Sequence, residues 1–311
     1  MIKESFSKFI FSLLASGVFY IAYSQEGMKL KDPELIVLGI AQDAGAPQIN
    51  CKKECCLKKE TSNYVVCLGL VEGEKRYLIE ATPNIGKQIS LFEEEYPFVH
   101  SFIDGIFITH AHIGHYSGLM YLGKESMNSR LIPTYMMPRL YDFILKNGPW
   151  SQLIETKNIQ PVRLKADRGI EVSNRITIIP FLVPHRDEFS ETVGYKIQGP
   201  NATVLFIPDI DKWTKWQKSI SEELKKVDFA LLDATFYDGK EINGRDLATI
   251  PHPFVVESLK YFNNLTLEEK SKIHFIHFNH TNPLLNESSK EYEMTLKNGY
   301  KVAHRGMRFK L

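Results

Sequence analysis

The feature that most constrains this chain is a run of three histidines, His110, His112 and His115, directly after an apolar stretch at residues 106–108. The apolar stretch predicts a buried strand. Side chains two residues apart lie on the same side of an extended chain, so His110 and His112 project together from the strand end. The Gly-His-Tyr-Ser-Gly that follows predicts a turn into a helix, which brings His115 back to the same point. Because neutral imidazoles are common ligands of zinc-like metals, the run predicts a metal site.

This histidine run resembles the His-x-His-x-Asp-His signature of the metallo-β-lactamase fold. The resemblance implies an α/β architecture, the four-layer αββα sandwich, and strand and helix patterns do alternate along the chain. The sequence departs from the signature at Gly114, which stands where the signature has Asp. In that superfamily the Asp is usually a ligand of the second metal. We therefore expect a tight first metal and a weaker second one, and we expect Gly114→Asp to strengthen the second site if the backbone accepts a side chain.

The second half of the chain places a histidine or an acid at the end of each predicted apolar strand: His185, Asp209, Asp233, and His277 with His280. Functional residues of sheet proteins gather at such strand ends. A buried acid without a partner is energetically costly, so Asp209 is expected beside the metal-binding histidines. The alternative is that Asp209 caps a helix after its strand.

The superfamily resemblance, carried over by position, implies two metal sites. The first is formed by His110, His112 and His185, and the second by His115 and His277 with Asp209 as a bridge. His277 is preferred to His280 because it precedes the Asn-x-Thr-Asn-Pro-like run, but His280 is close enough to replace it or to donate a proton.

The remaining polar candidates have weaker patterns. His252, between two prolines, lines the pocket or lies in a surface loop. Asp43 is a weaker candidate than Asp209 to orient the attacking water, and His274 is expected to be structural. The candidate catalytic residues are therefore Asp209, His280 and His252.

Longer motifs extend the resemblance from the superfamily to one family within it. They are Pro-Gln-x-Asn-Cys at 47–51, Ala-Thr-Pro-Asn at 81–84, Asp-Ala-Thr at 233–235 and His-Phe-Asn-His-Thr-Asn-Pro at 277–283. Together they resemble the coenzyme PQQ synthesis protein B (PqqB) family from about residue 35 to the end. The resemblance implies a PqqB-like paralogue with a different role. PqqB proteins have largely lost the first histidines of the metal motif, and they act in the cytoplasm on a peptide-derived precursor.

The first residues predict export. Lys3 and Lys8 accompany an apolar run at residues 9–22, and the small residues Ala22 and Ser24 stand where a signal peptidase reads. This pattern favours a signal peptide at 1–24, cleaved before Gln25, over a retained anchor, because the run is short for a membrane span. We expect residues 25–311 to form one domain, periplasmic or extracellular, with no stable membrane span after cleavage. The oligomeric state is not readable from the sequence.

Three of the four cysteines form a cluster, Cys51, Cys55 and Cys56, whereas Cys67 lies in an alternating strand pattern typical of a core residue. The cluster can hold a structural zinc. A disulfide is the alternative, because an exported chain permits one. Free thiols are the third reading.

These patterns predict an exported metal-dependent hydrolase. Zinc, with iron or manganese as alternatives, would act on an ester, lactone, amide or phosphodiester of a small-molecule substrate. A formal net charge of +1 gives no argument for a nucleic-acid partner. Two alternatives remain: a PqqB-type iron-dependent oxygenase in quinone cofactor biosynthesis, and a non-catalytic metal- or ligand-binding protein on the same fold.

Overall fold

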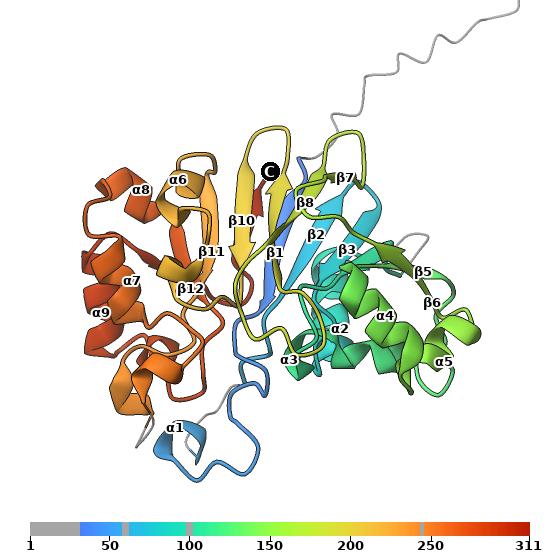
Figure 1. Ribbon diagram of the computed structural model, residues 1–311, viewed down its shortest axis with the longest axis horizontal. Coiled ribbons are helices and arrows are strands. Elements are labelled where there is room, and N and C mark those ends of the chain that lie inside the picture. Colours follow the sequence, from blue (N-terminus) through green and yellow to red (C-terminus); the bar gives the residue numbers. More distant parts are fainter. Residues whose placement is uncertain (1–31, 58–61, 98–101, 243–245) are drawn as a thin grey trace, which may run out of the picture. The chain divides into compact units, whose positions relative to one another are not determined.

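The computed structural model describes residues 32–57, 62–97, 102–242 and 246–311 (Figure 1). The chain from Lys31 to Leu311 forms one compact unit. The predicted signal peptide at residues 1–24 lies outside the described residues, so export stays a prediction. Among the residues that are described, no helix has the length and apolar character needed to cross a bilayer.

The first sheet contains both the first and the last strands of the described chain. Its strand order is β14-β1-β2-β3-β4-β5-β6. In chain order these strands are β1 (Glu34–Gly39), β2 (Cys67–Glu72), β3 (Lys75–Ile79), β4 (Gly105–Phe107), β5 (Ile132–Met136), β6 (Ile159–Arg163) and β14 (Arg308–Lys310). The predicted hairpin between β2 and β3 is confirmed. It turns at Gly73, whose φ of 57° is one that glycine adopts without steric cost.

The second sheet packs against the first, in the order β13-β12-β11-β10-β9-β8-β7. Its strands are β7 (Ile170–Glu171), β8 (Thr177–Leu182), β9 (Val193–Gln198), β10 (Thr203–Ile207), β11 (Phe229–Asp233), β12 (Ile273–Ile276) and β13 (Lys301–Val302). Strands β10, β11 and β12 are parallel, so their carboxyl ends meet at one edge. The second half of the chain therefore delivers its strand-end residues to a single place.

Helices cover the outer faces of both sheets (Figure 1). On the first sheet lie α2 (Ile85–Glu95), α3 (Ile113–Tyr116), the 3₁₀ helix η1 (Ser117–Leu122), α4 (Pro138–Lys146) and α5 (Trp150–Glu155). On the second lie α6 (Ile220–Leu224), α7 (Val255–Tyr261), α8 (Leu267–Ser271) and α9 (Lys290–Lys297). The short elements α1 (Glu54–Leu57), η2 (Trp213–Lys215), η3 (Gly239–Glu241), η4 (Leu247–Thr249) and η5 (Pro283–Leu285) lie in connections.

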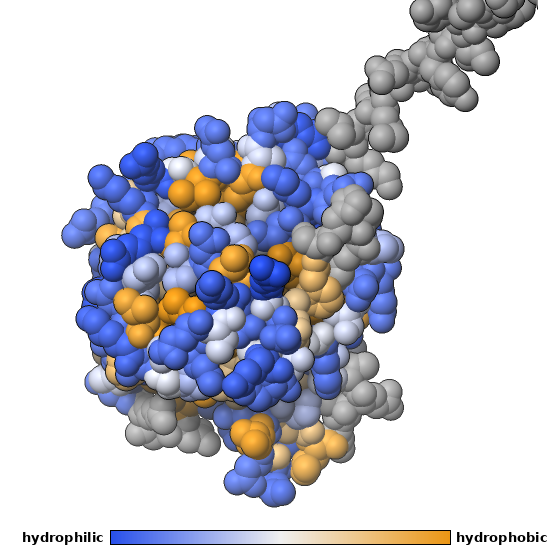
Figure 2. Space-filling model, turned by 90° about the vertical axis from the view of Figure 1, so that its right-hand side faces the viewer, coloured by the Kyte–Doolittle hydropathy of each residue, from blue (hydrophilic) through white to orange (hydrophobic). Residues whose placement is uncertain are grey.

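Strand β1 shows why the layers stack. Leu35 and Val37 point into the core between the two sheets, whereas Ile36 and Leu38 point into the core under the helices of the first sheet. A strand buried on both faces reads as a continuous apolar run, as this one does. The predicted αββα sandwich is confirmed. The face beside α4 and α5 is largely hydrophilic, with separate hydrophobic patches (Figure 2).

Two element boundaries are set by the local backbone and by loop contacts. Strand β5 begins at Ile132 because Leu131 has a φ of 51°, outside the strand region. Asn84 occupies the N-cap position of α2, but its side chain makes no capping hydrogen bond. Asn84 Oδ1 accepts a hydrogen bond from the Val65 backbone N–H at 2.9 Å. Cys67 and His274 are buried in strands of the two sheets, as predicted.

Candidate metal centre

The histidine run lies at the junction of the two sheets. It follows β4, and three hydrogen bonds tie it to the second sheet and its loops. Tyr195 Oη donates to the Ile108 carbonyl at 2.6 Å, the Val193 N–H to the Thr109 carbonyl at 3.2 Å, and the Ala111 N–H to Ser190 Oγ at 2.8 Å. The first sheet's histidines are thereby fixed against the strand ends of the second.

Asp209 lies at the centre of this junction, two residues beyond the end of β10, with 2% of its surface exposed. Its Oδ2 is 2.9 Å from His115 Nε2, 3.2 Å from His277 Nε2 and 3.6 Å from His110 Nε2. Its Oδ1 is 3.6 Å from His185 Nε2 and 3.5 Å from His252 Nδ1. The structure therefore places Asp209 between the two sets of histidines.

Overlapping groups of donor atoms surround this acid. In a first set, one ligand atom from each of His110, His112 and His185 lies within 4.8 Å of the others, and in a second set the same holds for Asp43, His115 and His277. Asp209 itself forms two further groups, one with His110 and His115 and one with Asp233, His252 and His277. The first set is the one that the sequence predicted. In the second, the sequence predicted both histidines but gave Asp43 only a minor role.

Polar contacts from behind orient the imidazole rings: hydrogen bonds at His110 and His277, and an ion-pair contact at His115. The Nδ1 atoms face an oxygen of a neighbouring residue: Thr109 Oγ1 at 2.9 Å from His110, Glu80 Oε1 at 3.1 Å from His115, and Thr235 Oγ1 at 2.9 Å from His277. Metal-binding histidines are usually held in this way, which leaves Nε2 for the metal. Sequence reasoning missed Glu80 and Thr235 as supports, although both stand at strand ends.

Unsatisfied buried atoms concentrate at this centre. Among the described residues, buried side-chain atoms without a hydrogen-bond partner include Asp43 Oδ1, His110 Nε2, both ring nitrogens of His115 and His185, Asp209 Oδ2 and His277 Nε2. Buried polar atoms are otherwise almost always paired. Imidazole nitrogens and carboxylate oxygens are the donor set of zinc and of iron. The cluster therefore fits a divalent metal cofactor.

The protonation states of His110, His185 and Asp209 suit metal binding in the metal-free protein. At His115, burial would lower the pKa, but Glu80 and the other neighbouring carboxylates raise it well above its usual range. Burial holds the pKa of His110 well below its usual range and lowers that of His185 to about 4. At Asp209, burial would raise the pKa, but the neighbouring histidines, His277 first, hold it well below its usual range. Neutral imidazoles and an ionised carboxylate are the forms that ligate metals.

His112 is the most exposed member of the first set. Its Nε2 lies 3.1 Å from Glu188 Oε2 in the loop after β8. With Nε2 engaged there, Nδ1 is the ring nitrogen available to a metal. The ring remains close to its partners, with its centroid 4.4 Å from that of His110 and 5.0 Å from that of His185.

His252 lines the site, which decides between the two readings that the sequence left open. Its Nδ1 lies 2.8 Å from Asp233 Oδ2, and the residue is 6% exposed. Burial would lower the pKa of His252, but the charge of Asp233 raises it above its usual value. Lys212 Nζ donates to the His252 carbonyl at 2.8 Å, which fixes the loop.

His280 is not at this centre, so its predicted role as a replacement for His277 or as a proton donor there is wrong. His277 has a φ of 67°, and the chain turns after it through residues 279–282. This turn places a ligand atom of His280 within 4.8 Å of those of Cys51, Cys55 and Cys56. Sequence spacing could not show this, because more than two hundred residues separate His280 from the cysteines.

The cysteine cluster has the composition of a metal site. No disulfide joins the four cysteines in the structure, and burial raises the pKa of Cys55 to about 11. The backbone N–H of Gln48 donates to Cys56 Sγ, and that of Lys53 to Cys51 Sγ, each at 3.4 Å. The second hydrogen bond is the main cause of a lowered pKa at Cys51. Three thiols and an imidazole form one of the usual structural zinc sets.

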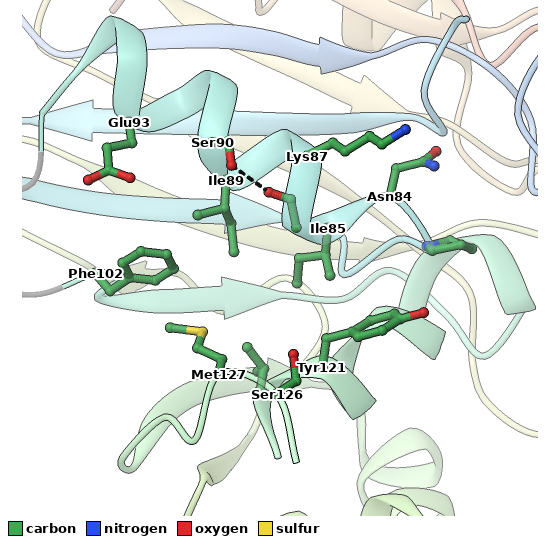
Figure 3. A pocket seen from close by; sticks show the side chains of 13 residues that line it. Asn84, Ile85, Lys87, Ile89, Ser90, Glu93, Phe102, Tyr121, Ser126 and Met127 are labelled. Atoms are coloured by element: carbon green, nitrogen blue, oxygen red, sulfur yellow. Dashed lines mark hydrogen bonds between the residues drawn. The ribbon is translucent and has the colours of Figure 1, made fainter. Parts of the chain in front are cut away.

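Two cavities differ in their relation to the centre. One, of about 440 Å³, is lined by His252 together with Gln42, Arg186, Phe236 and residues 249–251. The other, of about 320 Å³, lies between α2 and η1. The side chains labelled there, among them Ile89, Phe102 and Tyr121, belong to neither set of candidate ligands (Figure 3). Only the first of these two cavities adjoins the metal centre.

The chain belongs to the beta-lactamase superfamily, because the family model for the beta-lactamase superfamily domain matches residues 75–278. Its fold is that of this superfamily, and the donor atoms at the junction of its sheets fit a metal cofactor. The chain is similar to PqqB proteins. Coenzyme PQQ synthesis protein B of Rhizobium meliloti (strain 1021) is 25% identical over 319 residues, covering 91% of this chain and 99% of the relative. That of Xanthomonas oryzae pv. oryzae (strain MAFF 311018) is 25% identical, covering 89% and 99%.

Solved structures confirm the fold. The crystal structure of Zn²⁺-bound PqqB from Methylobacterium extorquens aligns with a TM-score of 0.74 at 20% identity, covering 89% of this chain and 100% of that one. A diphosphatase from the PhnP family aligns with a TM-score of 0.65 at 22% identity, covering 90% and 97%. The chain is thus a PqqB-like protein of the metallo-β-lactamase fold.

Proposed function

We propose that this protein is a metal-dependent hydrolase. The observation that carries the proposal is the convergence of unsatisfied, buried nitrogen and oxygen atoms on Asp209 from both sheets. Such atoms destabilise a purely structural core, because each buried polar atom that stays unpaired costs about 1 to 3 kcal/mol of folding free energy. A metal-binding catalytic centre uses all of them.

Each residue then has a distinct role. Bound zinc supplies hydroxide near neutral pH and polarises a carbonyl or phosphoryl oxygen. The first set holds one metal through His110, His112 and His185, and Asp209 reaches both sets. His252 faces the cavity of about 440 Å³ and is held by Asp233, so it can give a proton to a leaving group.

The same cavity favours a substrate with a negative charge and an apolar part. Arg186 stands next to His185 and is half exposed, with its guanidinium 3.5 Å from Glu188. Phe236 adds an aromatic ring to the same lining. Phosphodiesters, and esters that carry a carboxylate, combine a negative charge with an apolar part. We expect Arg186→Ala to raise KM for such substrates more than for neutral ones.

The test is turnover by purified protein stripped of metal and reloaded with zinc, manganese or iron. Chromogenic esters, lactones, amides and phosphodiesters cover the reaction classes. We expect turnover of at least one class, and a loss of at least about 100-fold in His110→Ala, because even residues behind the ligands cost 10- to 100-fold. His304→Ala is the control, since His304 is exposed and its ring Nδ1 lies 3.1 Å from the neighbouring Arg305 carbonyl, outside both sets of candidate ligands. Wild-type protein that holds no tight metal would contradict the proposal.

The second candidate function is iron-dependent oxygen chemistry in quinone cofactor synthesis. The observation that favours it is the similarity to coenzyme PQQ synthesis protein B over most of the chain. Oxygen uptake by the iron form, with no hydrolysis in the zinc form, would select it. A protein that binds metal tightly but turns over nothing would instead be a binding protein on this fold.

We further propose that Cys51, Cys55, Cys56 and His280 hold a structural zinc. The cluster joins the loop after β1 to the turn after β12. Such a site stabilises a fold by holding together segments that are far apart in sequence. This zinc would take no part in catalysis, and its loss would lower the stability of the fold more than the activity of the histidine centre.

A further inference from the structure

The starting point is the space beside Gly114, where the superfamily signature would place an aspartate. A Cβ at this position would lie 2.4 Å from Asp43 Oδ1 and 2.5 Å from Asp43 Cα. Both distances are well inside van der Waals contact. Gly114 is not among the positive-φ residues, so crowding by Asp43 is the obstacle to a side chain here. Asp43 therefore fills the space that a residue-114 side chain would need.

The carboxylate of Asp43 also faces the second set of ligands. Its Oδ1 is buried without a hydrogen-bond partner and lies 3.5 Å from His115 Nε2. A carboxylate oxygen of Asp43 also lies within 4.8 Å of a ring nitrogen of His277. An ionised oxygen at this position, aimed at two unpaired imidazole nitrogens, is what a second metal needs as a ligand.

The loop that carries Asp43 is fixed by backbone hydrogen bonds. The Phe278 N–H donates to the Ile40 carbonyl, and the Gln42 N–H to the Phe278 carbonyl, both at 2.8 Å. The Gly45 N–H closes the turn on the Gln42 carbonyl at 2.8 Å. The first two bonds join this loop directly to the residue after His277, so the carboxylate and the histidine move as one unit.

We propose that Asp43 supplies to the second metal site the carboxylate that position 114 lacks. This inference rests on the proposed metal centre and goes beyond it in assigning a ligand from a different segment of the chain. It also changes the expectation for metal affinity. With Asp209 and Asp43 both ionised, two carboxylates face two dications, so the second metal is held with an affinity comparable to that of the first.

The test measures metal content rather than turnover. Metal per chain is determined by elemental mass spectrometry while a chelator of known affinity is raised stepwise. Wild type should release the two metals of the histidine centre over a similar range of chelator, counted in a Cys51→Ser background so that the cysteine-held zinc does not contribute. Asp43→Asn, which keeps the shape and loses the charge, and Asp43→Ala should release the second metal at least about 10-fold more easily, at the lower end of the cost of losing a supporting group. Asp211→Asn is the matched control, because Asp211 pairs with Lys215 instead.

Variants at position 114 test the crowding by Asp43. Gly114→Asp alone should destabilise the protein, because its Cβ would overlap Asp43. Gly114→Asp combined with Asp43→Gly removes the carboxylate from that overlap but leaves the Cα of residue 43 at 2.5 Å from the new Cβ, so the double variant should stay destabilised.

The outcomes are distinguishable. Two metals in Asp43→Ala, released over the same range as in wild type, would overturn the inference and leave the metal centre standing. No tightly held metal at the histidine centre in wild type would overturn the proposed function as well. If Asp43→Ala does not fold, the comparison of Asp43→Asn with wild type decides, because the amide keeps the packing.

Discussion

Replacing Thr235 with Val tests whether the hydroxyl behind His277 sets the metal affinity. Thr235 is fully buried, and its Oγ1 lies 2.7 Å from Asp233 Oδ1, 2.9 Å from His277 Nδ1 and 3.1 Å from His252 Nδ1. Asp233 is ionised and can only accept, so the hydroxyl donates its hydrogen there and accepts from His277 Nδ1–H. That arrangement leaves the Nε2 lone pair of His277 for the metal.

The magnitude follows from the bonds lost. Val keeps the shape of Thr but leaves His277 Nδ1–H without an acceptor, at a cost of about 1 to 3 kcal/mol. Asp233 Oδ1 loses the hydrogen bond from the hydroxyl but still accepts one from the backbone N–H of residue 235 at 2.9 Å, so it remains partly satisfied. We expect the free energy of unfolding of the metal-free protein to fall by about 2 to 4 kcal/mol. The second metal should bind about 10- to 100-fold more weakly.

The assay pairs urea unfolding of the metal-free protein with chelator competition on the loaded one. Thr235→Ser is the matched control. It keeps the hydroxyl and loses only a methyl group, so it should cost about 1 kcal/mol in stability and leave metal affinity near wild type. Thr134→Val, a buried threonine whose Oγ1 donates to the Ile132 carbonyl, controls for a hydroxyl lost elsewhere. Unchanged metal affinity in Thr235→Val would refute the argument that this hydroxyl orients His277.

Three further predictions concern other parts of the chain. Cys51→Ser should remove about one zinc per chain and lower stability, whereas Cys67→Ala should leave the zinc content unchanged; equal zinc in both by elemental analysis would contradict a cysteine-held metal. Burial lowers the pKa of His274 in the folded state to about 4, so the unfolded chain takes up the proton first as the pH falls. The free energy of unfolding should therefore fall by up to about 3 kcal/mol as the pH drops from 6.5, the usual pKa of a histidine, to 4. His274→Phe should flatten that dependence in urea titrations, and an identical slope would count against it. Mass spectrometry of exported protein should find a mature N-terminus near Gln25, and full-length chain retained in the cytoplasm would refute the signal peptide.

The strand-end residues of the centre were readable from the sequence. Asp209 and His277 each follow an apolar strand, and the carboxyl ends of parallel strands meet at one edge, so their convergence follows from local patterns. Asp43 and His280 lie further along their loops and not at the end of an apolar strand, so the strand pattern does not place them. Their positions are set by loop contacts between distant segments, which no local pattern encodes. The one available signal for Asp43 was the glycine at position 114, since a missing carboxylate raises the question of what replaces it.

Strand β14 has a consequence for how this protein is made. Strand β1 pairs with β2 on one side and with β14 on the other, so residues near 35 need residues near 309 to complete their hydrogen bonding. During synthesis β1 can pair with β2 early, but its other edge stays open until the last strand has been translated. Leu35, Ile36 and Val37 on that edge are all buried in the finished protein. An unpaired apolar edge recruits other chains, so we expect forms truncated before β14 to aggregate even though their histidine centre is intact in sequence.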